Sequence, residues 1–183
     1  MKNKRGLIEK HGTPRFRRIL TPIDATQVKS GDLKPVLEVA QRLDAEVTLL
    51  HCYEIPLSFH YAVGRSALME VVLHRDLVRT HLLQLCAEVR KFFASCRSEF
   101  TVGSLPVEIL SASQRLQSDV ILVPLALDFG SYCWTTKEIM DELVRKADCP
   151  VVGFAFKVQK LRSRKFDQRL RVPPSVEINA SNE

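Results

Sequence analysis

The 183-residue sequence predicts a doubly wound α/β domain, in which helices cover both faces of a five-stranded parallel sheet. Five short β-rich runs alternate with four helical segments, and this alternation is typical of parallel sheets. The length fits one domain with a sizeable core. A composition of 45% apolar and 26% charged residues is ordinary for a globular protein.

The first half of the chain contains a strand–helix–strand unit. The run RILTPID at residues 18–24 is the first predicted strand, because its apolar residues end at a proline and an aspartate. Apolar residues at helical spacing predict a helix over 32–43, with Asp32 as its N-cap and Pro35 in the first turn. The run EVTLLHC at 46–52 is the second strand, which must be parallel to the first after such a crossover.

A stripe of apolar residues predicts a long helix that begins as early as Ser66. Its members recur at steps of three or four residues: Val78, Leu82, Leu85, Val89, Phe92 and Cys96. A coiled coil is the alternative, but the stripe covers only about three heptads and lies between strands, which favours a helix packed on the core. Strands are then predicted at 99–102, 119–124 and 150–156, a turn at 103–106, and helices at 107–116 and 136–147.

The net charge of +6 is concentrated at the two ends of the chain. Residues 1–18 have seven basic side chains and one acidic, whereas residues 157–183 have seven basic and three acidic. The middle of the chain is therefore acidic, with a net charge of −4. This distribution predicts a basic arm over 1–17, a domain over 18–156 and a basic tail over 157–183. Such ends keep a protein in solution or contact anionic partners such as nucleic acid.

Membrane and disulfide signals are both missing from the sequence. No apolar stretch near the start matches a signal-peptide core, and none approaches the roughly 20 apolar residues of a membrane span. We therefore expect a cytoplasmic protein without a membrane partner. The five cysteines are widely spaced and include no C-x-x-C pair, which predicts buried thiols, with Cys133 as the exception.

Several segments, in this order, resemble the universal stress protein family. They are ILTPID at 19–24, AQRLDAEVTLLH at 40–51, SDVILV at 118–123, and LVRKA at 143–147 followed by CPVV at 149–152. The resemblance covers about residues 17–156 and implies a flavodoxin-like, Rossmann-like α/β fold. In doubly wound sheets the ligand lies beyond the carboxyl ends of the strands, where the strand order reverses.

The family members that bind ATP have a glycine-rich motif, G-x2-G-x9-G-[ST], after the fourth strand, because glycine loops approach phosphates closely. Counting from Val123 and from Cys149-Pro150 places these motif positions at Pro124, Leu127, Lys137 and Glu138. Pro124 lacks a backbone donor, Leu127 adds bulk, and Glu138 adds negative charge. Lys137 offers a compensating charge, and Gly130-Ser131 a glycine out of register, but only with a remodelled loop.

The family-equivalent pocket is therefore predicted to be degenerate, so that no cofactor is expected and ATP or AMP is disfavoured. Its residues are Thr21, Pro22, Asp24, Cys52, Val123, Pro124, Leu127, Lys137 and Glu138. In the family an aspartate after the first strand lies near adenine and ribose. Asp24 has either that role or the structural one of capping the loop that follows it, and the missing phosphate loop favours the structural role.

Other chemistries have weaker signals. The sequence has no G-x-S-x-G elbow, and the adjacent His51 and Cys52 point to opposite faces of a strand, so they cannot form a dyad. His74 and His81 share a helix face but have no third ligand at metal-site spacing. The aromatic loop at 127–136 either lines a pocket for a flat ligand, presents an interaction surface, or packs on its own domain.

Three functional hypotheses follow from these observations. The first is a non-enzymatic regulatory protein that binds an unidentified protein partner and forms a homodimer through the apolar edge strand from Val151 to Phe156, as the family does. The second is a sensor of adenine nucleotides or other small molecules. The third is weak nucleic-acid association through the basic arms.

Overall fold

The computed structural model describes residues 16–55, 65–125 and 135–154, and the predicted arm and tail lie outside these ranges. The described residues form β1 (Arg18–Pro22), a 3-10 helix (Ser30–Leu33), α1 (Lys34–Leu43), β2 (Glu46–Tyr53), α3 (Arg65–Arg90), β3 (Cys96–Val102), α4 (Leu105–Arg115), β4 (Val120–Pro124), α5 (Thr136–Lys146) and β5 (Val151–Phe154). No helix among them is long and apolar enough to span a bilayer.

The five strands form one parallel sheet in the order β3-β2-β1-β4-β5. The chain moves outward from β1 through β2 to β3, then returns across the sheet to β4 and continues to β5. The strand order therefore reverses between β1 and β4. This confirms the predicted doubly wound sheet, and it places the switch point where Pro22 and Pro124 end their strands.

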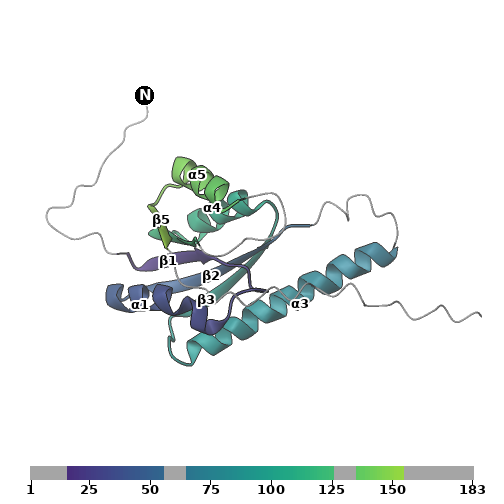
Figure 1. Cartoon of the computed structure of the whole chain (residues 1–183), viewed down its shortest axis with the longest axis horizontal. Helices are drawn as coiled ribbons and strands as arrows, with labels where there is room; N and C mark the ends of the chain where they lie inside the picture. Colours follow the sequence, from purple (N-terminus) through teal and green to yellow (C-terminus); the bar gives the residue numbers. More distant parts are fainter. Residues whose placement is uncertain (1–15, 56–64, 126–134, 155–183) are drawn as a thin grey trace, which may run out of the picture.

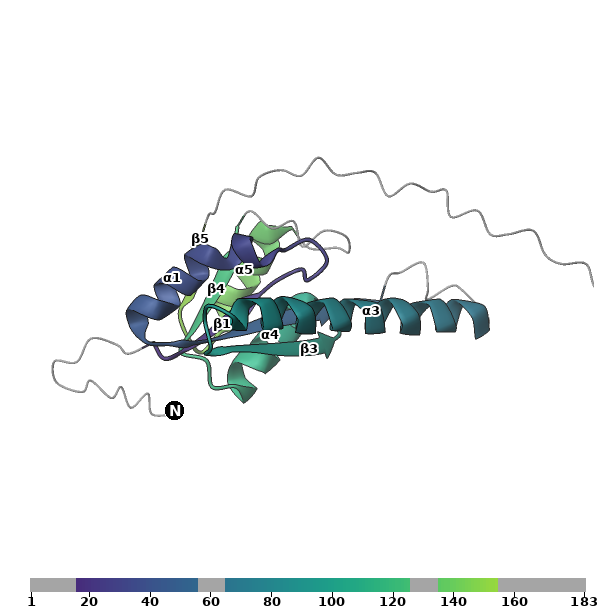
Figure 2. The same cartoon turned by 90° about the horizontal axis from the view of Figure 1, so that it is seen from below.

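Helices cover both faces of the sheet, as the sequence predicts. Figure 1 shows α1 and α3 on one face and α4 and α5 on the other. The contacts of α3 with β3 and of α4 with α5 agree with this arrangement. Figure 2 shows that α3 extends well beyond the ends of the strands, so that only part of this 26-residue helix packs on the sheet.

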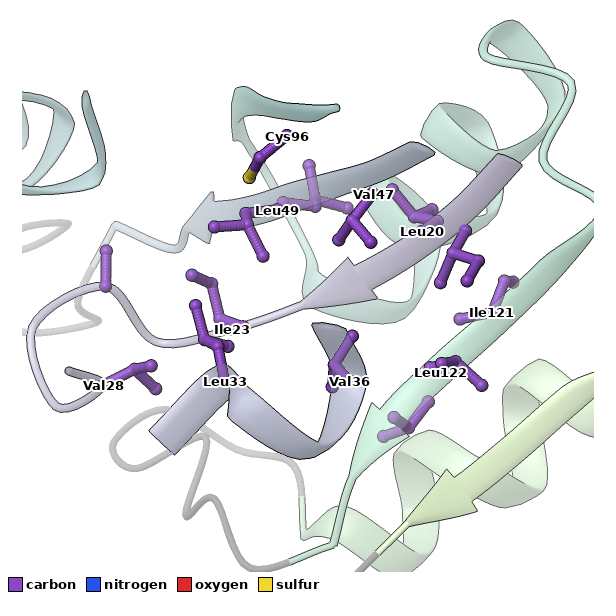
Figure 3. Close-up of a cluster of buried hydrophobic side chains, with 14 of the residues drawn as sticks. Leu20, Ile23, Val28, Leu33, Val36, Val47, Leu49, Cys96, Ile121 and Leu122 are labelled. Carbon is purple, nitrogen blue, oxygen red and sulfur yellow. The ribbon is translucent and has the colours of Figure 1, made fainter. Parts of the chain in front are cut away.

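The core is a layer of branched aliphatic side chains on each face of the sheet. β1 and β4 are central strands, and nearly all of their residues are buried, which is why they read as continuous apolar runs. Figure 3 shows Ile23 of the loop after β1 close to Leu33 and Val36, which come from the 3-10 helix and α1. All three side chains are at most 2% exposed.

The amino ends of β1 and β4 are joined by one carboxylate. Asp119 Oδ2 accepts hydrogen bonds from the backbone amides of Arg17 and Arg18, each at 2.9 Å. The Asp119 amide in turn donates to the carbonyl of Arg18 at 2.8 Å. These bonds connect positions about a hundred residues apart and set the register Ile19↔Val120.

Three predicted boundaries were wrong. The long helix ends at Arg90, and Cys96 begins β3 rather than ending the helical stripe. α4 begins at Leu105, inside the predicted turn, because proline is well tolerated in the first turn of a helix. Asp32 lies within the 3-10 helix and bonds back to the Lys29 amide at 3.0 Å, so Leu33 and not Asp32 precedes α1.

Leu82 and Leu83 are neighbours on α3 that lie in opposite environments, 1% and 55% exposed. We expect Leu82→Ala to lower the free energy of unfolding by about 2–5 kcal/mol, because it leaves a cavity in the core. Leu83→Ala is the matched control and should change it by about 0.5 kcal/mol or less. Urea unfolding followed by circular dichroism measures both, and equal losses would contradict this packing of α3.

Candidate functional site

The candidate site is the carboxyl edge of the sheet around the switch point. β1, β2 and β4 end there at Pro22, Tyr53 and Pro124. Because the helices run antiparallel to the strands, the N-termini of α4 and α5 also point toward this edge, on one face of the sheet. Ligands of doubly wound folds bind at such an edge, since helix N-termini attract negative charge.

Asp24 organises the turn that follows β1. Its Oδ1 accepts hydrogen bonds from the Thr26 amide at 2.9 Å and from the Thr26 hydroxyl at 2.6 Å, while its Oδ2 accepts from Gln27 Nε2 at 2.7 Å. The Asp24 carbonyl also accepts from the amides of Gln27 and Val28, each at 3.1 Å. Both carboxylate oxygens are therefore engaged within the turn, which is the structural role that the sequence favours.

His51 and Cys52 lie on opposite faces of β2, as the strand alternation predicts. His51 packs on Phe100 with ring centroids 5.7 Å apart and contacts the turn after β1. Cys52 donates from its thiol to the Gly103 carbonyl at 3.1 Å. Burial raises the pKa of the Cys52 thiol to about 12, so that it stays protonated and unreactive at neutral pH.

The backbone after β4 has little to offer a phosphate. Pro124 has no amide hydrogen, and the Leu125 amide donates to the Phe154 carbonyl at 2.8 Å. Leu125 also fills the space above β5, where a Cβ added to Gly153 would come within 2.8 Å of Leu125 Cδ2. Leu127, the next motif position, lies outside the described residues.

The N-terminus of α5 is closed by its own carboxylate. Thr135 Oγ1 accepts a hydrogen bond from the Glu138 amide at 3.2 Å. Glu138 Oε2 accepts from the Thr135 amide at 2.7 Å and from the Thr135 hydroxyl at 2.9 Å. These bonds form a reciprocal capping box, and they hold the pKa of the Glu138 carboxyl below its ordinary value.

A second carboxylate occupies the N-terminus of α4. Glu54, the residue after β2, accepts a hydrogen bond from the Leu105 amide at 2.6 Å. The ammonium group of Lys137, the candidate compensating charge, donates to Asp141 Oδ2 at 2.8 Å, and this bond raises the pKa of Lys137. Both helix N-termini on this face therefore already hold an anion from the chain itself.

The remaining predicted pocket residues are buried rather than available to a ligand. Thr21 is fully buried, and among the described residues its hydroxyl is one of two buried side-chain polar atoms without a hydrogen-bond partner. Pro22, Val123 and Pro124 are buried as well. Thr135 is a further residue of this edge that was not predicted from the sequence, although its T-x-x-E spacing to Glu138 is a recognisable capping signal.

The described residues contain no group of three side chains suited to hold a metal ion. A cavity of about 710 Å³ lies at the other end of the sheet, where the strands begin. Arg17, Asp44, Glu46 and Asp119 are among its lining residues, and their mixed charges select no one class of ligand. The cavity is thus far from the predicted pocket.

No protein-family model and no curated protein matches the chain. Solved structures do resemble it. Universal stress protein UspA from Lactobacillus plantarum is similar with a TM-score of 0.59 and 18% identity, over 78% of this chain and 99% of that one. A universal stress protein family member from Burkholderia pseudomallei is similar with a TM-score of 0.58 and 17% identity, over 78% and 98% of the two chains. The chain therefore has the fold of the universal stress proteins, as the sequence resemblance predicts.

The capping box makes the stability of the fold depend on pH. Because the folded pKa of Glu138 is lowered from its ordinary 4.5, its ionised form stabilises the protein above that pH, and this stability is lost as the pH falls through the folded value. Glu138→Gln retains a capping side chain without the charge. We expect wild type to be more stable than the variant near neutral pH and the difference to vanish in acid, as measured by urea unfolding.

The control is Glu88→Gln, at an exposed glutamate on α3. It should leave the pH profile of stability close to that of wild type. A Glu138→Gln variant whose difference from wild type stays constant between about pH 7 and pH 3 would show that the ionised carboxylate does not stabilise the helix terminus.

Proposed function

We propose that this chain is a non-enzymatic regulatory module with the universal stress protein fold. It lacks the glycine-rich phosphate-binding motif and acts in the cytoplasm through contacts with other proteins. The observation that carries the proposal is the occupation of the α5 N-terminus by Glu138. A helix N-terminus binds a phosphate through free amides and a positive dipole. Here a carboxylate of the chain already takes that place.

The electrostatics of the whole edge support the proposal. Asp24, Glu54 and Glu138 all belong to this edge, and each is hydrogen-bonded to backbone amides there. A polyphosphate would have to approach three carboxylates, and like charges repel unless a metal ion intervenes. Lys137, at the start of α5, is paired with Asp141.

The two edges of the sheet differ in a way that supports a homodimer through β5. The edge strand β3 has charged side chains, Arg97 and Glu99, which form ion pairs with Glu46 and Arg115. Charged residues of this kind protect an edge from pairing with another chain. β5 is the uncharged run VVGF, and Val152 is 46% exposed. We therefore propose that Val151 to Phe156 pairs with the same strand of a second copy.

A nucleotide titration tests whether the chain binds adenine nucleotides. We expect 1 mM ATP, ADP or AMP, with Mg²⁺, to shift the melting temperature by less than about 1 °C. A ligand at a hundred times its Kd would stabilise the native state by about 2.7 kcal/mol, which corresponds to a shift of several degrees. Differential scanning fluorimetry measures the shift, and one of several degrees would support a nucleotide sensor instead.

Glu138→Gln serves as the comparison in the same titration. If nucleotide shifts the melting temperature of the variant but not that of wild type, the negative charge of Glu138 is what excludes the phosphate. If neither protein binds, the charge of Glu138 is not the feature that excludes the phosphate.

The dimer prediction concerns Val152. Val152→Lys places a charge on the apolar edge strand, and we expect it to convert a dimer into a monomer, because a charged edge opposes strand pairing. Val107→Lys on α4 is the control, since Val107 is 60% exposed and lies away from the edge. Light scattering after gel filtration gives the mass. A monomeric wild type at about 100 μM, or a dimeric Val152→Lys variant, would contradict the proposal.

A further inference from the structure

One nitrogen of His51 faces two backbone groups of opposite character. His51 Nδ1 lies 3.1 Å from the carbonyl oxygen of Ile23 and 3.2 Å from the amide nitrogen of Ala25. A carbonyl accepts a hydrogen and an amide donates one, so a single ring nitrogen cannot satisfy both at once. His51 is 7% exposed and Ala25 is 6% exposed, so water has little access to either group.

The Ala25 amide decides which tautomer the neutral ring adopts. If Nδ1 carried the hydrogen, the buried Ala25 N–H would point at another N–H and have no acceptor. Buried amides without an acceptor are rarer in proteins than under-satisfied carbonyls. The neutral ring therefore carries its hydrogen on Nε2, and Nδ1 accepts the hydrogen of Ala25.

We propose that His51 is an acid-sensitive latch on the turn formed by residues 23–28, which Nδ1 holds by accepting the Ala25 amide hydrogen and releases when it becomes protonated. Protonation turns Nδ1 into a donor, whose hydrogen points to the Ile23 carbonyl. The Ala25 N–H then faces a donor and loses its acceptor. No other atom has to move for the bond to break, because both partners already lie within hydrogen-bond distance.

The groups around His51 set the pH at which the latch opens. Burial lowers the pKa of His51 below its ordinary 6.5, Asp24 and the Ile23 carbonyl act in the opposite direction, and His74 of α3 lowers it further. Phe100 of β3 contributes an uncharged ring stacked at 5.7 Å. With a lowered folded pKa, the latch stays closed at neutral pH, and the stability that it contributes is lost as the pH falls below about 6.5.

The turn that would loosen is the one that positions Asp24 at the carboxyl edge. The Asp24 carboxylate accepts hydrogen bonds from Thr26 and Gln27, the two residues that follow Ala25. Release of the Ala25 amide leaves the described turn bonded to β2 through Ile23, whose amide donates to the Leu50 carbonyl at 2.8 Å and whose carbonyl lies 3.1 Å from Nδ1. The segment that follows Ile23 would therefore change shape in acid. The inference does not depend on whether the site binds nucleotide or protein.

Amide hydrogen exchange and nitrogen NMR of the full-length chain test the latch. We expect the His51 ring to be the Nε2–H tautomer at pH 7.5. On acidification the protection factor of the Ala25 amide should fall by roughly five- to tenfold, as for the loss of one hydrogen bond. The pH midpoint of this fall should equal the midpoint of the His51 titration. An Nδ1–H tautomer at pH 7.5, or an Ala25 protection factor that does not change across the His51 titration, would overturn the proposal.

His51→Asn is the matched variant, because its side-chain oxygen can replace Nδ1 as an acceptor that does not titrate. It should keep the Ala25 amide protected at both pH values. His74→Asn removes the neighbouring titratable ring and should retain the pH-dependent loss of protection. If His74→Asn abolishes that loss, the latch belongs to His74 and the assignment to His51 is wrong. If His51→Asn does not fold, the tautomer of His51 and the pH dependence of Ala25 protection in the wild-type protein still test the proposal.

Discussion

The pairing of β1 with β4 is the contact on which the rest of the structure depends. These strands are about a hundred residues apart in the sequence, yet Asp119 accepts both amides at the start of β1 and fixes their register. The pairing lies at the centre of the sheet, so both strands need cover on both faces, which α1 and α3 supply on one side and α4 and α5 on the other. It also creates the switch point and thereby decides where the strand ends and helix N-termini meet.

The order of elements could be predicted from the sequence because each strand and helix has its own local pattern. The buried run at β4 and the part of the apolar stripe from Val78 to Val89 on α3 are examples. The errors lie where two patterns meet. Cys96 continues the spacing of the α3 stripe, yet it begins β3. The chain turns back after α3, and this brings the Cys96 sulfur within 3.8 Å of the Cys86 sulfur on that helix. Spacing alone cannot distinguish these two arrangements.

The sequence predicts which residues stand at the motif positions of the candidate site, but not the hydrogen bonds that those residues make. Pro124 and Glu138 could be assigned to motif positions by counting. The bond from Leu105 to Glu54 could not, because it joins the ends of two elements that only the folded sheet brings together. The contact of His51 with the turn after β1 is hidden for the same reason, since it crosses from one strand to the loop of its neighbour.

The two carboxylates at the helix N-termini have a simple physical explanation. The N-termini of α4 and α5 have unpaired amides and a positive dipole whether or not a ligand is bound, and these need an acceptor. In an ATP-binding site the nucleotide supplies that acceptor, so the empty protein has to tolerate unsatisfied or hydrated amides. In this chain Glu54 and Glu138 supply it permanently. The same carboxylates that stabilise the two helices without a ligand place negative charge where a phosphate would have to approach.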